Sequence, residues 1–287
     1  MTGNHNVHPA ISRTGPLPPT EQRNAASYHL DTLDALGVVE LMNREEQRAL
    51  DAVGEAAGQL ATVAQRVADC VQAGGRVVLL GAGTSGRLAL QEVAELPPTF
   101  GLAPEIFHVL AAGSAAMGPA VITNTEDDTE AAPTALAAQG IGPADVVIGL
   151  AASGTTPFVR SGIKAATQLG SWTCGIANNP GTPLLTDGGY GVLLDTGPEV
   201  LTGSTRLKAG TAQKLALNRI TTAAMVVDGR VIENHMLDVT GSNAKLRLRA
   251  LRIVSDITGW DDTRVRTTLE RNAWSVRAAL KGAGRAG

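Results

Sequence analysis

Short apolar runs that alternate with helical periodicity constrain the fold of this chain more than any other feature. The runs occupy residues 77–80, 106–110, 145–150, 172–177 and 192–195. Between them, the spacing of apolar residues predicts helices over residues 88–96, 129–139 and 158–169. Apolar strands that alternate with helices are typical of a parallel sheet covered on both faces. The sequence therefore predicts a doubly wound α/β domain.

Helical segments and a polar stretch flank the predicted sheet. Residues 1–20 are rich in Pro, Gly, Asn and His and show no periodicity, so we expect a mobile tail. Apolar spacing predicts short helices between residues 28 and 52, and then a longer helix that ends at Gly74-Gly75. These helices precede the first strand and belong to the main domain.

The pattern after Leu201 is wholly helical. The predicted helices cover residues 205–228, 243–257 and 263–281. Gly259 is the best candidate for a domain boundary, because it separates two helical patterns. The chain is then divided into a tail of residues 1–20, a main domain of residues 21–257 and a small helical appendage of residues 258–287.

Composition and charge exclude several classes of partner. A formal net charge of -3 is too small to indicate a nucleic-acid or membrane surface. The chain lacks a run of about 18 apolar residues and a signal-peptide pattern, so we expect a cytoplasmic protein. Cys70 and Cys174 lie far apart in apolar contexts, which favours buried thiols over a disulfide. No spacing of His, Cys and carboxylates suggests a metal site.

The stretch GAGTSG, residues 81–86, matches a dinucleotide fingerprint directly after the first predicted strand. A dinucleotide site also needs a carboxylate after the second strand, where this chain has Ala111-Ala112-Gly113. A second turn, Ala152-Ser-Gly-Thr-Thr-Pro157, follows the third strand and is also rich in hydroxyls. Two such turns at adjacent strand ends predict a monophosphate cradle, since helix N-termini favour anions. Helix N-capping is the alternative, and it explains one such turn better than two.

The candidate ligand-binding residues fall in these two turns and at the start of the long predicted helix. Ser204 belongs to the second group, because a Gly-Ser-Thr start of a helix is a good anion site. Lys208 also belongs to it, because a cation at a helix N-terminus is unfavourable unless an anion compensates it. The candidates are Gly83, Thr84, Ser85, Gly86, Ser153, Gly154, Thr155, Thr156, Ser204 and Lys208.

Several motifs together resemble one family. They are GAGTSGRL, ELPPTFG from Glu95, the Glu126-Asp127-Asp128 run, AASGTTPFV and LTGSTRLKAGTAQKLALN at 201–218. In this order and spacing the chain is similar to the N-acetylmuramic acid 6-phosphate etherases, from about Thr20 to Leu280. The resemblance implies a sugar isomerase (SIS) domain, which is a flavodoxin-like sandwich. Glucokinase regulatory protein shares this domain but is much larger.

The resemblance also implies a reaction and its residues. Such etherases are carbon–oxygen lyases of cell-wall sugar recycling, which remove D-lactate from the sugar phosphate by elimination and then hydration. The reaction needs an acid and a base but no cofactor or metal. Glu95 and Glu126 match the family's two glutamates, and we expect Glu95 to be the acid and Glu126 the base. Because both follow strands of successive β-α units, we expect them to face one crevice. The family implies a homodimer whose sites are completed across the interface.

Some residues depart from the family pattern. Thr155 stands where the family has Arg, Asn178 where it has Cys, and His235 where it has Leu. These departures leave open a lyase or isomerase acting on another phosphosugar. A phosphosugar-binding regulator without turnover is the second alternative, although a pure sensor would need neither Glu95 nor Glu126.

Overall fold

The computed structural model describes residues 16–112, 124–239, 241 and 243–284. Its centre is a parallel five-stranded sheet in the order β2-β1-β3-β4-β5. The strands are β1 (Val77–Gly81), β2 (Phe107–Ala111), β3 (Val146–Leu150), β4 (Trp172–Ala177) and β5 (Tyr190–Leu193). This strand order is that of flavodoxin-like folds, so the predicted doubly wound class is confirmed.

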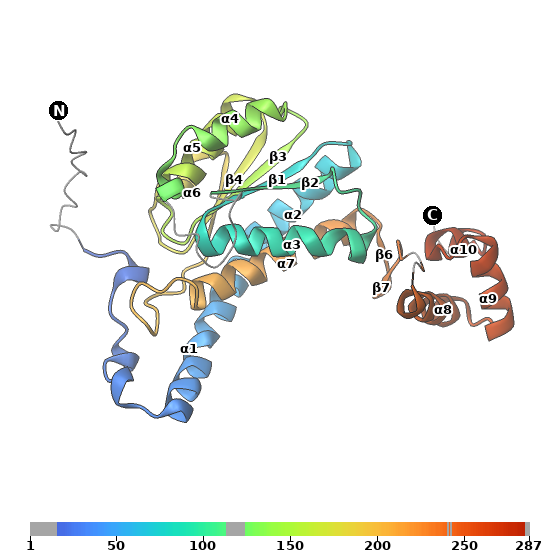
Figure 1. The fold of residues 1–287 in the computed structure, drawn as a ribbon, viewed down its shortest axis with the longest axis horizontal. Coiled ribbons are helices and arrows are strands. Elements are labelled where there is room, and N and C mark those ends of the chain that lie inside the picture. The colour runs from blue at the N-terminus through green and yellow to red at the C-terminus, as the bar shows by residue number, and fades with distance from the viewer. Residues whose placement is uncertain (1–15, 113–123, 240, 242, 285–287) are drawn as a thin grey trace, which may run out of the picture.

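Helices cover both faces of the sheet (Figure 1). One face carries α2 (Ala57–Gln72), α3 (Gly83–Phe100) and α7 (Lys208–Val227). The other face carries α4 (Ala131–Ala138), α5 (Pro157–Gln168) and α6 (Leu184–Asp187). The third predicted strand and helix are each within one residue of these bounds, whereas α3 begins five residues earlier than the predicted helix 88–96.

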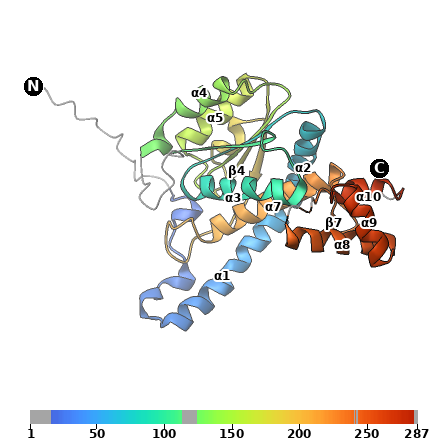
Figure 2. The same ribbon diagram turned by 45° about the vertical axis from the view of Figure 1, so that its right-hand side comes forward.

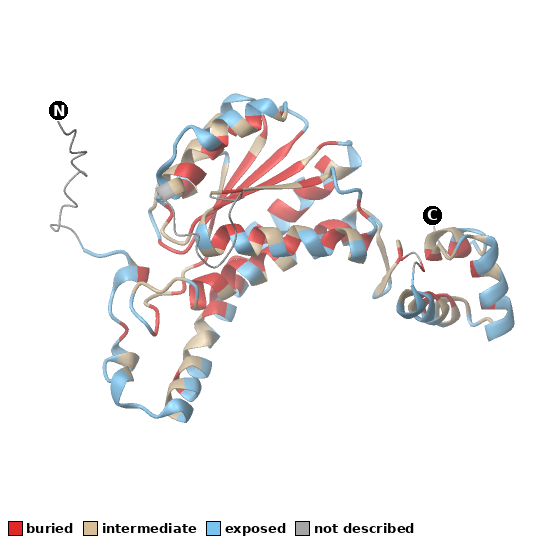
Figure 3. Ribbon diagram, in the orientation of Figure 1, coloured by how far each residue is buried: buried red, intermediate tan, exposed pale blue. Residues whose placement is uncertain are grey.

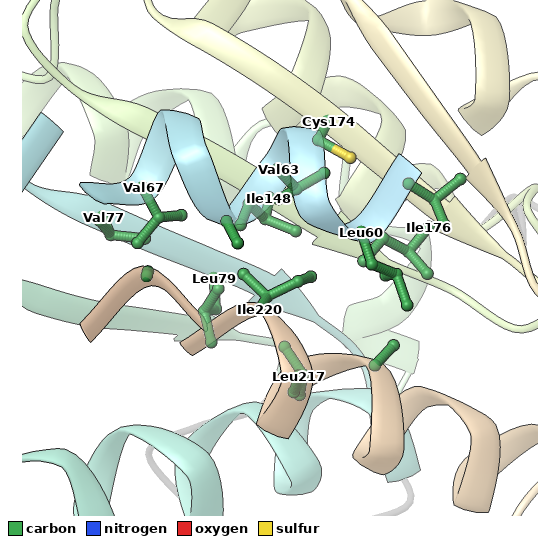
Figure 4. Close-up of a cluster of buried hydrophobic side chains, with 14 of the residues drawn as sticks. Leu60, Val63, Val67, Val77, Leu79, Ile148, Cys174, Ile176, Leu217 and Ile220 are labelled. Carbon is green, nitrogen blue, oxygen red and sulfur yellow. The ribbon is translucent and has the colours of Figure 1, made fainter. Parts of the chain in front are cut away.

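The hydrophobic core lies between the sheet and these two helical layers (Figure 3). Every residue of β1 and β3 is buried, as expected for strands covered on both faces. Leu79 and Ile148 lie between α2 and α7, where they meet Val63 and Ile220 (Figure 4). Because few aromatic side chains are available, this core consists mainly of Ala, Val, Leu and Ile.

The N-terminal segment begins with short 3-10 turns at Pro19–Glu21, Ala25–Ser27 and Leu30–Thr32. Helix α1 (Ala35–Glu55) follows and extends away from the sheet (Figure 2). Most of the predicted mobile tail lies outside the described residues. Thr20 does not fit that prediction, because it is buried and exchanges two hydrogen bonds with Asn179.

The C-terminal helices form a separate hydrophobic cluster. They are α8 (Ala244–Thr258), α9 (Asp262–Arg271) and α10 (Val276–Lys281), preceded by the hairpin of β6 (Val231–Ile232) and β7 (His235–Met236). Ala250 and Val254 of α8 share this cluster with Val265 and Leu269 of α9. The packing therefore groups α8 with the later helices and differs from the boundary predicted at residue 258. Gly259 is a left-handed cap that ends α8 within this unit.

Both cysteines are buried free thiols, as the sequence predicts. Burial raises the pKa of the Cys70 thiol to about 11, and it raises the pKa of the fully buried Cys174 further. Within the part of the chain that the structure describes, no helix is both long enough and apolar enough to cross a membrane.

Candidate functional site

A hollow of about 420 Å³ lies where β1 and β3 end at the same edge of the sheet. Its volume suits a small ligand, and its position is the usual binding edge of open α/β sheets. Both predicted turns line it. The residues around it are Glu21, Ala82, Gly83, Thr84, Ser85, Glu126, Asp127, Ala151, Ala152, Ser153, Thr155, Thr156, Pro157 and Thr205.

The first turn is held tightly between β1 and the start of α3. A Cβ atom on Gly81 would lie 2.7 Å from the backbone nitrogen of Gly86, so this approach requires glycine. Gly83 has a positive φ of 53° and opens the helix. Helix α3 has no side-chain cap, and Thr84 and Ser85 both line the hollow. Gly86 lies beneath the turn rather than in the lining, so its contribution is to bring the helix close to the strand.

The second turn precedes α5 and brings two hydroxyls together. Ser153 Oγ lies 3.4 Å from Thr156 Oγ1, and it accepts a hydrogen bond from the backbone N–H of Thr155. Gly154 has a positive φ of 69°, and a Cβ there would overlap Thr182, so it shapes the turn without lining the hollow. Thr156 is the N-cap residue of α5 but makes no side-chain cap bond. Helix capping therefore explains neither turn.

A buried chain of hydrogen bonds supports the first turn from behind. Ser85 Oγ donates to Gln213 Oε1 at 2.7 Å, and Gln213 Nε2 donates to Asn178 Oδ1 at 3.0 Å. Asn178 Nδ2 in turn donates to the carbonyl of Leu194. Asn178, a departure from the family pattern, is thus fully buried and fixes Gln213.

Three acidic residues also line the hollow. Glu126 and Asp127 come from a 3-10 turn, η5 (Asn124–Asp127), and Glu21 comes from the N-terminal segment. None of the described residues that line the hollow is a Lys or an Arg. A carboxylate at this edge can serve as a base, whereas an anionic ligand must rely on hydroxyls, backbone N–H groups and helix dipoles.

Known proteins resemble the chain over most of its length. A family model of the N-terminal SIS domain of glucokinase regulatory protein matches residues 59–167. The N-acetylmuramic acid 6-phosphate etherase of Histophilus somni is 42% identical over 91% of this chain and 86% of its own length. The etherases of Trichormus variabilis and Geobacillus thermodenitrificans are 44% and 42% identical over 91% of this chain, covering 85% and 88% of theirs. This chain belongs to the N-acetylmuramic acid 6-phosphate etherase family. The resemblance carried by the sequence motifs is confirmed.

Solved structures share the fold at low sequence identity. Phosphoheptose isomerase from Neisseria gonorrhoeae is 17% identical with a TM-score of 0.51, covering 67% of this chain and 99% of that one. A phosphoheptose isomerase from Francisella tularensis is 17% identical with a TM-score of 0.50, covering 67% of this chain and 98% of that one. These structures support the SIS fold of the etherase family.

The two family glutamates do not meet within one chain. Glu126 lines the hollow, but Glu95 is exposed in the second half of α3 and does not. Because a helix rises about 1.5 Å per residue, Glu95 lies roughly 18 Å along the axis from Gly83. Within one chain the two glutamates therefore do not share this hollow, and the expectation that they face one crevice stays a prediction.

The start of α7 is occupied by groups of the chain itself. Lys208 is buried, and its ammonium lies 2.8 Å from Glu45 of α1. The backbone N–H groups of Lys208 and Ala209 donate to the fully buried carboxylate of Glu199. Burial raises the pKa of Glu199, although these hydrogen bonds act in the opposite direction. Glu45 thus supplies an anion for the Lys208 ammonium, and the role of Lys208 in ligand binding stays a prediction.

The remaining residues that the sequence singled out differ in whether they line the hollow. Ser204 does not line the hollow, whereas Thr205, which the sequence argument did not select, does. Thr155 lines it, as predicted. His235 lies in the β6–β7 hairpin, 3.8 Å from Asp256 of α8, and does not line the hollow. Within the described ranges, no three side chains of His, Cys, Asp or Glu gather as metal ligands do.

Proposed function

We propose that the hollow binds the phosphate of N-acetylmuramic acid 6-phosphate and that the chain cleaves its D-lactyl ether. The observation that carries the proposal is that Glu126 and the hydroxyls of both turns line one hollow, in a member of the etherase family. The hydroxyls of Ser153 and Thr156, together with the starts of α3 and α5, provide donors for the phosphoryl group. We then expect the sugar ring to lie beside η5, whose Glu126 and Asp127 line the same hollow.

The chemistry then follows from the position of the base. In the ring-opened sugar, the aldehyde acidifies the proton on carbon 2, and the Glu126 carboxylate removes it. Lactate leaves from carbon 3 with a proton supplied by Glu95, which forms a carbon–carbon double bond between carbons 2 and 3. Water adds to that double bond, with hydroxyl at carbon 3 and a proton at carbon 2, to give N-acetylglucosamine 6-phosphate. We expect this reaction in the cytoplasm.

The distance of Glu95 from its own hollow supports a dimer in which the partner supplies this residue. Glu95 is exposed beside an apolar groove of about 210 Å³, which includes Leu96, Pro97 and Phe107. A symmetric dimer that covers this groove brings each Glu95 toward the other chain. Each of the two sites then combines Glu126 of one chain with Glu95 of its partner.

Incubation with N-acetylmuramic acid 6-phosphate and an assay for D-lactate tests the activity. We expect stoichiometric lactate and N-acetylglucosamine 6-phosphate, and very poor turnover of the sugar without phosphate. Tight binding without lactate would instead favour a phosphosugar-binding regulator. Turnover of other phosphosugars in place of this one would favour a related lyase or isomerase.

Two glutamine variants test the roles of the glutamates. Glu126→Gln should abolish exchange of the carbon 2 proton with deuterated solvent, together with lactate release. Glu95→Gln should block ether cleavage but leave that exchange measurable. Each loss should lower the rate by about 10²–10⁴-fold. If Glu95→Gln loses deuterium exchange and Glu126→Gln keeps it, then Glu95 is the base and Glu126 is the acid.

Mixing the two inactive variants tests the shared site. If each site combines residues of two chains, a mixed dimer contains one site with both wild-type glutamates. Random reassociation should then restore about a quarter of the parental activity. Two glutamates from a single chain would give no recovery, because neither variant chain has both. The lactate assay with each variant alone is the control.

A further inference from the structure

The buried chain behind Ser85 has only one possible direction of hydrogen bonding. It ends at the carbonyl of Leu194, which accepts only, so the end of Asn178 that faces it at 2.8 Å must be the NH₂ group. The other end of Asn178 is then its oxygen, which obliges Gln213 to donate with its own NH₂ group. The Leu194 carbonyl thus fixes which end of each amide donates and which end accepts.

The same logic fixes the proton of Ser85. With its NH₂ group directed at Asn178, Gln213 presents its oxygen to Ser85, 2.7 Å away. A hydroxyl has one proton, and here that proton is used on Gln213. Ser85 therefore faces the hollow with lone pairs alone. The residue is buried, with 6% exposed, so solvent does not readily replace this partner.

The charges around the hollow point in the same direction. The titratable groups that line it are Glu21, Glu126 and Asp127, and the described lining contains no cation. Gln213 of α7 and Asn178, which follows β4, add no charge behind Ser85. A ligand oxygen without a proton would meet only lone pairs at Ser85, whereas an oxygen that carries a proton would make a hydrogen bond.

We propose that Ser85 is an acceptor that selects an O–H group of the ligand, and that Gln213 and Asn178 are positioning residues that set this polarity. On a phosphosugar the O–H group is either the protonated oxygen of a phosphate monoanion or a sugar hydroxyl. The inference deepens the proposed phosphosugar site and rests on it. It concerns binding alone, so it is tested without turnover.

Calorimetric Kd values for methyl phosphate, a monoester without a sugar hydroxyl, and for N-acetylglucosamine 6-phosphate provide the test. They are measured between about pH 5 and pH 8, which brackets the second pKa of a phosphate monoester near 6. The quantity of interest is the ratio of the Kd of Ser85→Ala to the Kd of the parent. Glu21, Glu126 and Asp127 are present in both proteins, so the ratio isolates the contribution of Ser85. We expect a ratio of about 3 to 10 where the O–H group is present.

The pH dependence of the ratio separates the outcomes. A ratio that is largest at low pH for both ligands identifies the phosphate monoanion. A ratio that is constant with pH for the sugar phosphate, and near one for methyl phosphate, identifies a sugar hydroxyl. A ratio that grows as the pH rises would mean that Ser85 donates to the dianion, and it would overturn the proposal. A ratio near one for both ligands would overturn it too, while a lactate assay tests the proposed function separately.

Gln213→Met tests the positioning role. This substitution removes the acceptor, so the Ser85 hydroxyl can donate its proton to a phosphate dianion. The ratio of the Kd of the double variant Gln213→Met/Ser85→Ala to the Kd of Gln213→Met should therefore grow as the pH rises. Thr221→Val is the matched control, because Thr221 on the same helix donates to Glu92 and is buried away from the hollow. It should lower stability but keep the parental pH dependence. The same pH dependence in Gln213→Met as in the parent would show that Gln213 does not set the polarity of Ser85.

Discussion

Lys208 donates to Glu45 across 163 positions of sequence, with its ammonium nitrogen 2.8 Å from the carboxylate oxygen. The lysine side chain is only 3% exposed and the glutamate 23%. Burial alone would raise the pKa of Glu45, but hydrogen bonds from Lys208 and Asn24 and the lysine charge lower it. This ion pair therefore ties α1 to the start of α7.

We expect Lys208→Met to lower stability more than it changes substrate affinity. The methionine keeps the aliphatic stem but leaves the Glu45 carboxylate without its partner, at a cost of about 2–4 kcal/mol. Chemical denaturation measures the loss, and KM measured at a temperature where the variant is folded should change little.

Lys214→Met is the matched control on the same helix, because Lys214 is exposed. It should alter the free energy of unfolding by less than about 0.5 kcal/mol. Parental stability and a strongly raised KM in Lys208→Met would instead show that Lys208 binds the substrate.

Asp145 stabilises the fold at the opposite edge of the sheet, where it accepts hydrogen bonds from Arg76 and from the backbone N–H of Gly142. Asp145→Asn removes the charge opposite Arg76, and we expect a loss of about 2–4 kcal/mol at neutral pH. Urea denaturation measures it, with the exposed Asp51→Asn on α1 as the control.

The loss should depend on pH in one direction. Burial alone would raise the pKa of Asp145, but hydrogen bonds from the Arg76 side chain and from two backbone N–H groups hold it below its ordinary value of 3.8. The carboxylate therefore contributes its full stabilisation above 3.8, and the contribution disappears as the pH falls through the lower pKa of the folded state. The difference between parent and Asp145→Asn should shrink below about pH 4. A difference that is equal at pH 7 and pH 3 would contradict this role.

Gly86 provides a test of the close approach between α3 and β1. A Cβ atom there would lie 3.1 Å from the Ala111 side chain and 3.1 Å from the carbonyl oxygen of Gly81. We expect Gly86→Ala to cost about 1–3 kcal/mol in thermal or chemical denaturation and to raise KM, because the turn shifts with the helix.

Gly54→Ala provides the comparison. Gly54 is also in a helix, but no atom lies within 4 Å of a Cβ built there. Alanine should stabilise that position by up to about 1 kcal/mol and leave KM unchanged. Equal effects of the two substitutions would mean that helix propensity, and not the contact with β1, limits Gly86.

Local patterns predicted the sheet well, because buried parallel strands are continuous apolar runs. Trp172–Ala177 matches its predicted bounds residue for residue, and both hydroxyl-rich turns lie at adjacent strand ends as expected. Helix starts were less predictable. The early part of α3 consists of Gly, Thr and Ser, which carry no apolar periodicity, so the helix was expected to begin only at Leu88.

The partners of distant residues could not be predicted from local patterns. The charge of Lys208 indicated an anion nearby, yet Glu199 and Glu45 are ordinary carboxylates in the sequence, and only the fold brings them to α7. The packing of α8 against the later helices was not predictable for a similar reason, because a glycine that ends a helix resembles a linker in the sequence. Thr205 likewise reaches the hollow through the path of the loop before α7.

Thr156→Val separates a ligand contact from a helix cap. The Thr156 side chain makes no cap bond to α5, and its hydroxyl lies 3.4 Å from Ser153 Oγ. Valine has nearly the same shape, so we expect a change in unfolding free energy below about 1 kcal/mol. The affinity for the phosphosugar should fall about 10- to 100-fold, as expected for a lost hydrogen bond to a charged group. Both quantities are measured on the same preparation, by denaturation and by KM.

Asp261→Ala is the converse variant. Asp261 does cap a helix, since its carboxylate accepts from the backbone N–H of Arg264 at the start of α9. Its loss should cost about 1 kcal/mol in the stability of the C-terminal helices and leave KM at the parental value. Thr156→Val should therefore lower affinity without lowering stability, and Asp261→Ala should lower stability without lowering affinity. If Thr156→Val instead lowers stability as Asp261→Ala does and leaves KM unchanged, the hydroxyl of the second turn supports the helix and does not bind phosphate.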